Sequence, residues 1–333
     1  MLKDMLERIR DAHAVNRLSK SLLKLKEERA LGHRNLKATG SYEELCDSIS
    51  EAIDNGHLSL DDIAKIVNEV EENGRQHIFL FSEENTKYLS DIVEQLSGNF
   101  PHAQTSDVRK NYAKLPAEDR VWYEDRSPTH ILKFTGTTSY WTINAEQSQE
   151  SEERIVIVKD KRQSRVIHLL KVHSDSGLIE VRIQAAGADA PSTQWKTDFF
   201  MFANLFSSVL PLEQLSAVPI WKGFRSQIKE TEGTYLVTDE AFEAQTTQRI
   251  SLRREHGKDL REHKDYDLDD IRFARDTLNI YWFVHDQEDD EYRIHTIQQR
   301  VNLNKNEYAK VWISRHVPNE CIDILLDRII GRI

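Results

Sequence analysis

The spacing of apolar residues changes once along the chain, and this change limits the folds that the sequence can adopt. Up to about residue 97, apolar side chains recur every three or four residues, the period of an amphipathic helix. From about residue 129, β-branched and aromatic residues recur with a period of two, which is typical of strands. The sequence therefore predicts an α+β protein, with an N-terminal all-helical domain followed by a mostly antiparallel sheet domain with flanking helices.

A polar stretch that contains prolines separates the two regions. Pro101, Pro116 and Pro128 lie in a segment with neither period, as expected of a connection between domains. A length of 333 residues also favours two domains, because a single core seldom grows that large. We predict a helical domain over residues 1–97, a linker over 98–128 and an α+β domain over 129–333.

Capping residues mark the beginnings of the predicted helices. One helix is expected from Leu2 to about residue 29, because leucines form a continuous stripe along it. Ser41 with Glu44 three residues later predicts a capping box at the start of a second helix. Ser59 caps a third, whose buried face includes Ile66. Further helices are expected at 83–96, after an apolar run at 77–81, and near 193–209, 267–275 and 318–331.

Short runs of β-branched and aromatic residues predict the sheet. Polar connections separate these runs, and the segment from Ser174 to Gly177 has the composition of a hairpin turn. This arrangement favours antiparallel neighbours. The predicted strands are 130–134, 138–144, 154–160, 164–173, 178–184, 234–238, 248–253, 279–284, 292–297 and 309–314.

Composition limits the compartment and the partners. A net charge of -11 favours solubility and disfavours a protein that coats nucleic acid over its whole surface. Cys46 and Cys321 lie far apart, so they predict neither a disulfide framework nor a cysteine-rich zinc site. No segment has the roughly 20 apolar residues of a membrane span, and the N-terminus lacks a secretory signal. We expect a cytoplasmic protein, nuclear if eukaryotic, without membrane association.

The motifs of common enzymes are missing from the sequence. The twelve glycines include no G-x-G-x-x-G, no Walker loop and no G-x-S-x-G elbow. Each of these loops brings backbone N–H groups or a nucleophile close to a substrate, so their absence disfavours the corresponding chemistry. We therefore assign no catalytic residue and expect neither a cofactor nor a small-molecule substrate.

Two arrangements bear on metal-dependent chemistry. His256 and His263 would lie roughly 10 Å apart along a helix, which is too far for one ion. A restriction-type nuclease needs an Asp on one strand and a D/E-x-K on the next, and Asp160 and Glu180 match this pattern only in part because Arg182 replaces the lysine. We assign no metal ligand. A metal-dependent nuclease-like subunit with a degenerate site stays as the alternative function.

Positive charge is concentrated near the N-terminus. Residues 1–40 contain ten Lys or Arg against five Asp or Glu, whereas residues 41–75 contain two against ten. A basic helix face can neutralise nucleic-acid phosphates, or it can pair with the acidic helices that follow. The residues that we assign to nucleic-acid binding are Arg10, Arg17, Lys20, Lys24, Arg29, Arg34 and Lys37.

Two resemblances bear on function. The segment 36–53, with Gly40, Ser41 and Leu45, resembles part of the SAP domain, a helix–loop–helix module that binds DNA. At a larger scale, the order of a pyrin-like helical start, capped helices, the apolar run at 77–81 and an antiparallel α+β region is similar to the CENP-N family of centromere proteins. That resemblance implies a non-enzymatic adaptor that binds DNA or nucleosomes and partner subunits. In this sequence, the residues closest to the family's DNA-contacting surface would be Arg10, Arg17, Lys20 and Lys24.

These observations predict a non-enzymatic adaptor subunit of a multi-protein complex. Protein subunits are the expected partners, and DNA is expected to contact the N-terminal basic helix. The overall negative charge departs from this expectation, so binding would be confined to one local surface.

Overall fold

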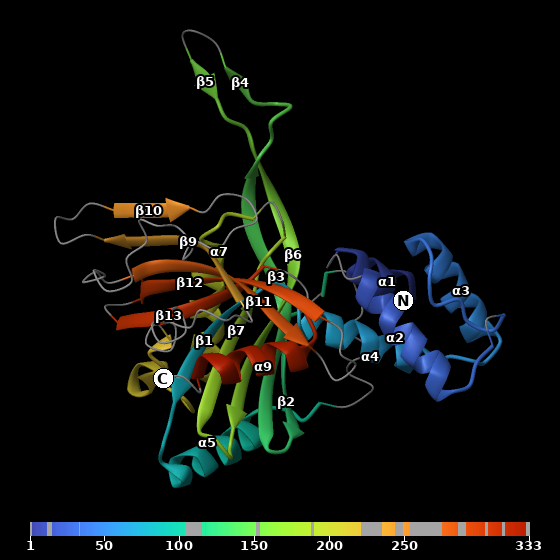
Figure 1. The fold of residues 1–333 in the computed structure, drawn as a ribbon, viewed down its shortest axis with the longest axis horizontal. Helices are drawn as coiled ribbons and strands as arrows, with labels where there is room; N and C mark the ends of the chain where they lie inside the picture. The colour runs from blue at the N-terminus through green and yellow to red at the C-terminus, as the bar shows by residue number, and fades with distance from the viewer. Residues whose placement is uncertain are drawn as a thin grey trace.

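The computed structural model combines an N-terminal group of helices with one long sheet that has helices on both faces (Figure 1). This arrangement confirms the predicted α+β class with helices at the N-terminus. No described helix has the length and apolar character that a membrane crossing requires. The described residues are 2–11, 15–32, 34–103, 115–116, 118–150, 154–187, 190–220, 235–243, 249–253, 275–285, 291–303, 306–314 and 317–330.

Four helices share one apolar core at the N-terminus. Both predicted caps are confirmed, because the Ser41 and Ser59 hydroxyls accept bonds from the backbone N–H groups of Glu44 and Asp62, whose carboxylates return the bond. Apolar residues such as Leu22, and Ile66 on the opposing helix, are buried between the helices. The helices are α1 (Leu2–Asp11), α2 (Val15–Glu28), α3 (Tyr42–Asp54) and α4 (Leu60–Glu72).

The sheet runs in the order β10-β9-β11-β12-β13-β1-β7-β6-β3-β2, and β8 also pairs with β1. Each pair along this path is antiparallel in the described residues. The strands are β1 (Gln76–Ser82), β2 (Arg120–Arg126), β3 (Thr129–Ile143), β6 (Lys159–His173), β7 (Leu178–Gln184), β8 (Ser216–Ala217), β9 (Tyr235–Glu243), β10 (Arg249–Arg253), β11 (Arg275–His285), β12 (Glu291–Leu303) and β13 (Asn306–Ile313).

Strand β1 belongs to two apolar cores because its side chains alternate between the two faces of the sheet. Phe79 and Phe81 pack in the core beneath α5 (Thr86–Asn99) and α7 (Gln194–Phe206). Ile78 and Leu80 pack in the core beneath α9 (Asn319–Ile330). The rest of the architecture comprises a short 3-10 turn, η1 (Leu212–Gln214), and a separate pair of two-residue strands, β4 (Gln149–Glu150) and β5 (Ile155–Val156).

The central position of β1 corrects the predicted domain limits. We expected residues up to 97 to form a helical domain, but β1 lies between β7 and β13, and α5 packs on the sheet. The expected linker at 98–128 contains β2, which pairs with β3. The helical unit therefore ends near residue 72, and the sheet region begins at residue 76.

Several predicted elements have different limits in the structure. The expected first helix is two helices, α1 and α2. The expected strands 130–134 and 138–144 form one strand, β3, in which Gly136 leaves room for the Phe134 ring and the Asp119 carboxylate. The expected strand at 154–160 is mostly absent, since β5 holds two residues and β6 begins at Lys159. The expected helix near 267–275 lies outside the described residues, except that Arg275 begins β11.

Buried ion pairs join the helical unit to the sheet. Glu71 of α4 pairs with Arg8 of α1 and, at 3.0 Å, with Nε of Arg165 on β6. Glu72 pairs with Lys133 of β3 at 2.6 Å and with Arg126 of β2 at 3.0 Å. Apart from Arg126, whose side chain is 46% exposed, these charged groups are largely shielded from water, so α4 is held in one position relative to β2, β3 and β6.

Candidate functional site

The basic residues expected on one helix belong to two helices. Arg17, Lys20 and Lys24 lie on α2 at spacings of three and four residues, so they share one side of that helix. Arg10 belongs to α1, and its side chain lies outside the described part of the structure. Arg17, Lys20 and Lys24 therefore form a group of their own.

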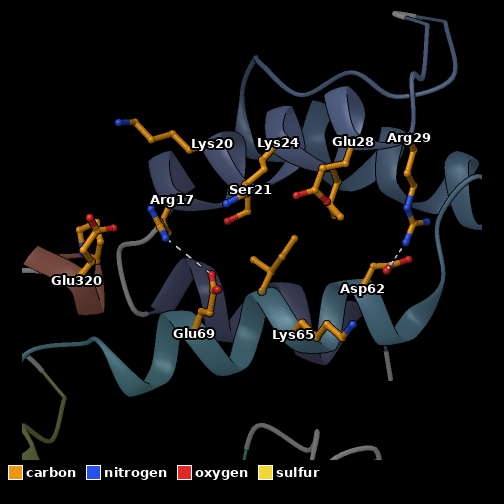
Figure 2. Close-up of a pocket in the computed structure, with 13 residues that line it drawn as sticks. Arg17, Lys20, Ser21, Lys24, Glu28, Arg29, Asp62, Lys65, Glu69 and Glu320 are labelled. Carbon is orange, nitrogen blue, oxygen red and sulfur yellow. Dashed lines mark hydrogen bonds and ion pairs between the residues drawn. The ribbon is translucent and has the colours of Figure 1, made fainter. Parts of the chain in front are cut away.

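A pocket of about 380 Å³ opens beside this group, between α2 and α4, and the first residues of α9 border it (Figure 2). Ile66 is buried beneath it and, with Leu25, supplies apolar surface. The basic residues that line the pocket are Arg17, Lys20, Lys24, Arg29 and Lys65, and the acidic ones are Glu28, Asp62, Glu69 and Glu320. The pocket thus has a mostly charged lining with a small apolar part.

Two arginines in the lining pair with carboxylates of α4. Arg17 Nη2 lies 3.8 Å from Oε2 of Glu69, and both side chains are partly exposed, so this pair contributes little to stability. Arg29 Nη2 lies 2.5 Å from Oδ1 of Asp62, and its Nη1 donates to the carbonyl of His57 at 3.0 Å. Arg29 therefore ties the region after α2 to the start of α4.

Asp62 has a structural role as well as a place in the lining. It accepts bonds from the backbone N–H and hydroxyl of Ser59, both at 2.7 Å. Burial opposes ionisation of this carboxyl, but the bonds from Ser59 and Arg29 outweigh burial and lower its pKa. Asp62 thus stays charged and keeps Arg29 in place at neutral pH.

The lysines of the pocket come from opposite walls. Lys24 of α2 and Lys65 of α4 are both exposed, and Lys20 lies one turn before Lys24 (Figure 2). Cationic groups on two facing helices can contact one anionic group from both sides. Arg17, Arg29 and these lysines therefore line one pocket from both of its helices.

Arg34 and Lys37 do not line this pocket. Both lie in the connection between α2 and α3, where Arg34 is exposed. Lys37 Nζ pairs with Oε1 of Glu44 at 2.6 Å, and the bond from Lys37 is the main cause that lowers the pKa of Glu44. Of the seven basic residues assigned from the sequence, Arg17, Lys20, Lys24 and Arg29 therefore line the pocket, whereas Arg34 and Lys37 do not.

No protein-family model matches the chain, and a search of curated proteins found no relative.

The pocket contains residues that sequence reasoning missed. Lys65 lies within the acidic segment 41–75, so the net charge of that segment gives no sign of a basic site residue there. Pro318 and Glu320 are some 250 residues further along the chain than α4, and no local pattern connects them to it. The positively charged lining was detectable only on α2.

The residues of the alternative nuclease site do not meet. Asp160 pairs with Thr142 in the ladder of β3 and β6, whereas Glu180 pairs with Lys171. Eleven residues of β6 separate Asp160 from Lys171, roughly 36 Å at the rise of a strand. Within the described residues, no three His, Cys, Asp or Glu side chains could hold one metal ion.

Glu180 is fully occupied by neighbouring side chains. Its carboxylate accepts a bond from Arg182 at 2.6 Å and lies 2.7 Å from Nε2 of His173. Burial opposes its ionisation, but Arg182 and Lys171 outweigh burial and hold its pKa below the usual range. Arg182 also reaches Asp323 of α9 at 3.1 Å. Glu180, Arg182 and Asp323 therefore fix α9 on the sheet.

His256 and His263, the other residues considered for a metal site, lie outside the described residues.

Proposed function

We propose that this protein is a non-enzymatic adaptor whose α2–α4 pocket binds the phosphate backbone of a nucleic acid. The observation that supports this proposal best is that Lys20 and Lys24 of α2 and Lys65 of α4 line the same pocket. A lysine binds a phosphate as a compact point charge, and two facing helices allow such charges to approach the phosphate from both sides.

The charge balance of the pocket sets the expected mode of binding. Glu69 and Asp62 pair with Arg17 and Arg29, and the lining as a whole holds five basic side chains against four acidic ones. Binding is therefore local and salt-dependent rather than spread over the protein. This mode is compatible with a net charge of -11, because a Debye length of about 8 Å at physiological salt screens distant acidic residues.

The adaptor part of the proposal rests on the connection between the pocket and the sheet. One wall of the pocket is α4, and the next residues of that helix, Glu71 and Glu72, pair with Arg165 and Lys133 of the sheet. A nucleic acid held at the pocket would therefore have a fixed orientation relative to the sheet. We propose that partner subunits bind other surfaces of the same rigid structure.

The test measures affinity for a fluorescent DNA duplex by anisotropy at several salt concentrations. The variant Arg17→Gln, Lys20→Gln, Lys24→Gln removes three basic groups from the pocket. If each contacts a phosphate, the slope of log affinity against log salt falls by about 2.7, at about 0.9 per contact. The same measurement with single-stranded RNA identifies which nucleic acid is preferred.

The control carries Lys3→Gln, Lys87→Gln and Lys196→Gln, which change the formal charge equally at exposed positions outside the lining. This variant should keep most of the wild-type slope. Equal slopes for the two variants would reject the pocket as the binding site, and wild-type protein that binds neither DNA nor RNA at low salt would reject nucleic-acid binding altogether.

A further inference from the structure

Another group of cationic and aromatic side chains lies where the first turn of α7 packs on strands β1 and β13. His77 of β1 is opposite Trp312 of β13, and Phe79 is opposite Lys310. Directly opposite residues point to one face of a sheet, and Phe79 places these side chains on the face that α7 covers. The ring centroid of Trp195, from α7, lies 5.4 Å from that of His77 and 5.7 Å from that of Phe79.

Two lysines lie close to the single indole ring of Trp195. The Nζ atom of Lys310 is 4.0 Å from the ring centroid, and that of Lys196 is 5.6 Å from it. Lys196 follows Trp195 in α7 and is exposed, whereas Lys310 is only 4% exposed. Burial and the charge of Lys196 lower the pKa of Lys310 to about 8, so most of this side chain is still an ammonium at pH 7.

The buried ammonium of Lys310 has no hydrogen-bond acceptor among the described residues. The two other buried lysines there do have one: Lys133 donates to a carboxylate at 2.6 Å, and Lys171 donates to an amide oxygen at 2.9 Å. The face of Trp195 attracts a cation, but it replaces none of the acceptors that water offers to the three N–H groups. Because a buried charge without an acceptor is costly, this position favours an anion beside Lys310.

The surroundings of Lys310 offer donors and little negative charge. Nε1 of Trp312, which can only donate, and Nδ1 of His77 are buried without a partner. Burial lowers the pKa of His77 to about 2, so this ring is neutral and does not repel Lys310. No side chain caps α7 at Thr193, and the positive end of the helix dipole favours an anion there. Asp198, the one acidic residue of α7, accepts a bond from the Thr138 hydroxyl instead.

We propose that Lys310 and Lys196 together bind a free phosphate anion at the start of α7. Lys310 supplies buried donors, and Lys196 supplies the exposed charge that the anion meets first. Phosphate suits this site better than a carboxylate does, because its tetrahedral oxygens accept bonds from several sides. A backbone phosphate of a nucleic acid is flanked by sugars and cannot reach a lysine that is 4% exposed. The site is therefore independent of the α2–α4 pocket, with which it shares no residue.

The test titrates inorganic phosphate into the full-length protein at constant ionic strength and measures the heat of binding. We expect one phosphate per chain that depends on Lys310. Lys310→Met removes the charge and keeps the length of the side chain, so it should raise Kd by about tenfold or more. Lys196→Met removes an exposed charge and should raise Kd by about two- to fivefold. The control Lys87→Met removes an exposed lysine of α5 and should bind as wild type does.

Two further measurements distinguish binding from a purely structural role of Lys310. Between pH 8 and pH 9 phosphate stays a dianion while Lys310 loses its proton, so the affinity of wild type should fall by about fivefold and that of Lys310→Met should not. In chloride without phosphate, Lys310→Met should unfold at the same temperature as wild type or higher, because it removes a buried charge without an acceptor.

Four outcomes would overturn the proposal. These are wild type that binds no phosphate, acetate that binds as tightly as phosphate, and unchanged affinity in both Lys310→Met and Lys196→Met. The fourth is a Lys310→Met variant that unfolds at a lower temperature than wild type in chloride, since Lys310 would then serve the fold through Trp195. Because Lys196 is exposed, Lys196→Met tests the site even if Lys310→Met does not fold.

Discussion

Lys133 Nζ lies 2.6 Å from Oε1 of Glu72, and both side chains are buried where α4 meets the sheet. Arg126 approaches the other carboxylate oxygen of Glu72 at 3.0 Å. Burial opposes ionisation of Glu72, but Lys133 and Arg126 outweigh burial and hold its pKa well below the usual range. The connection between the helical unit and the sheet thus depends on a charge inside the protein.

Removing this charge should be strongly destabilising. Glu72→Leu removes the carboxylate that pairs with the buried Lys133 ammonium. We therefore expect a loss of about 3–5 kcal/mol in the free energy of unfolding, measured with urea. The double variant Glu72→Leu, Lys133→Met removes both charges, so it should lose less than the single variant. A double variant that is less stable than Glu72→Leu would contradict this account.

Acid should destabilise the protein through His168. This side chain is buried against Phe134 and Phe202, and burial lowers its pKa to about 3. Because the folded pKa is below the unfolded value of about 6.5, the unfolded state binds more protons between these values, so stability falls as pH decreases below 6.5. At pH 5 the loss from His168 should reach about 2 kcal/mol.

The variant His168→Gln isolates this contribution from that of other titrating groups. Its free energy of unfolding should change less between pH 7 and pH 5 than that of wild type, whatever its absolute stability. Both curves retain the contribution of His77, whose pKa burial lowers to about 2. Parallel curves for the two proteins would mean that His168 titrates alike in the folded and unfolded states.

Ile66 links the core of the helical unit to the pocket. It is buried and it contributes to the pocket lining. Ile66→Ala should therefore reduce the free energy of unfolding by about 2–5 kcal/mol. The exposed Lys65→Ala on the same helix should change stability by less than about 0.5 kcal/mol. Similar losses for the two variants would contradict burial of the Ile66 face.

A fragment that begins at residue 129 should not fold. It lacks β1, which fills the place between β7 and β13 and supplies Phe79 and Ile78 to two cores. We expect no cooperative thermal transition by circular dichroism, in contrast to the full chain. A sharp transition in the fragment would show that the sheet closes without β1 and would restore a domain boundary after residue 97.

Local chemistry made part of this fold predictable. Ser41 with Glu44, and Ser59 ahead of Asp62, identify helix starts because a cap acts within one turn. The length of the first helix was wrong, because α1 and α2 both contribute to the stripe that enters one core, for example through Ile9 and Leu18. A continuous stripe does not reveal a break between helices.

Long-range pairing made the rest unpredictable. Residues 77–81 were recognised as an apolar run, but their position depends on β7 and β13, which lie about 100 and 230 residues further along the chain. The candidate site shows the same limit. Charge and spacing identify the α2 lysines as candidate site residues. Lys65 lies beside them only because α4 packs against α2, and the sequence does not show that packing.

The position of β1 also bears on the order in which a nascent chain can mature. Its neighbour β13 lies about 230 residues further along the chain, so β1 leaves the ribosome long before this partner has been synthesised. During that interval Ile78 and Leu80 lack the strands and the helix that cover them in the finished protein. Synthesis therefore exposes an apolar strand edge to other chains, so this segment is prone to aggregation until β13 and α9 have been made.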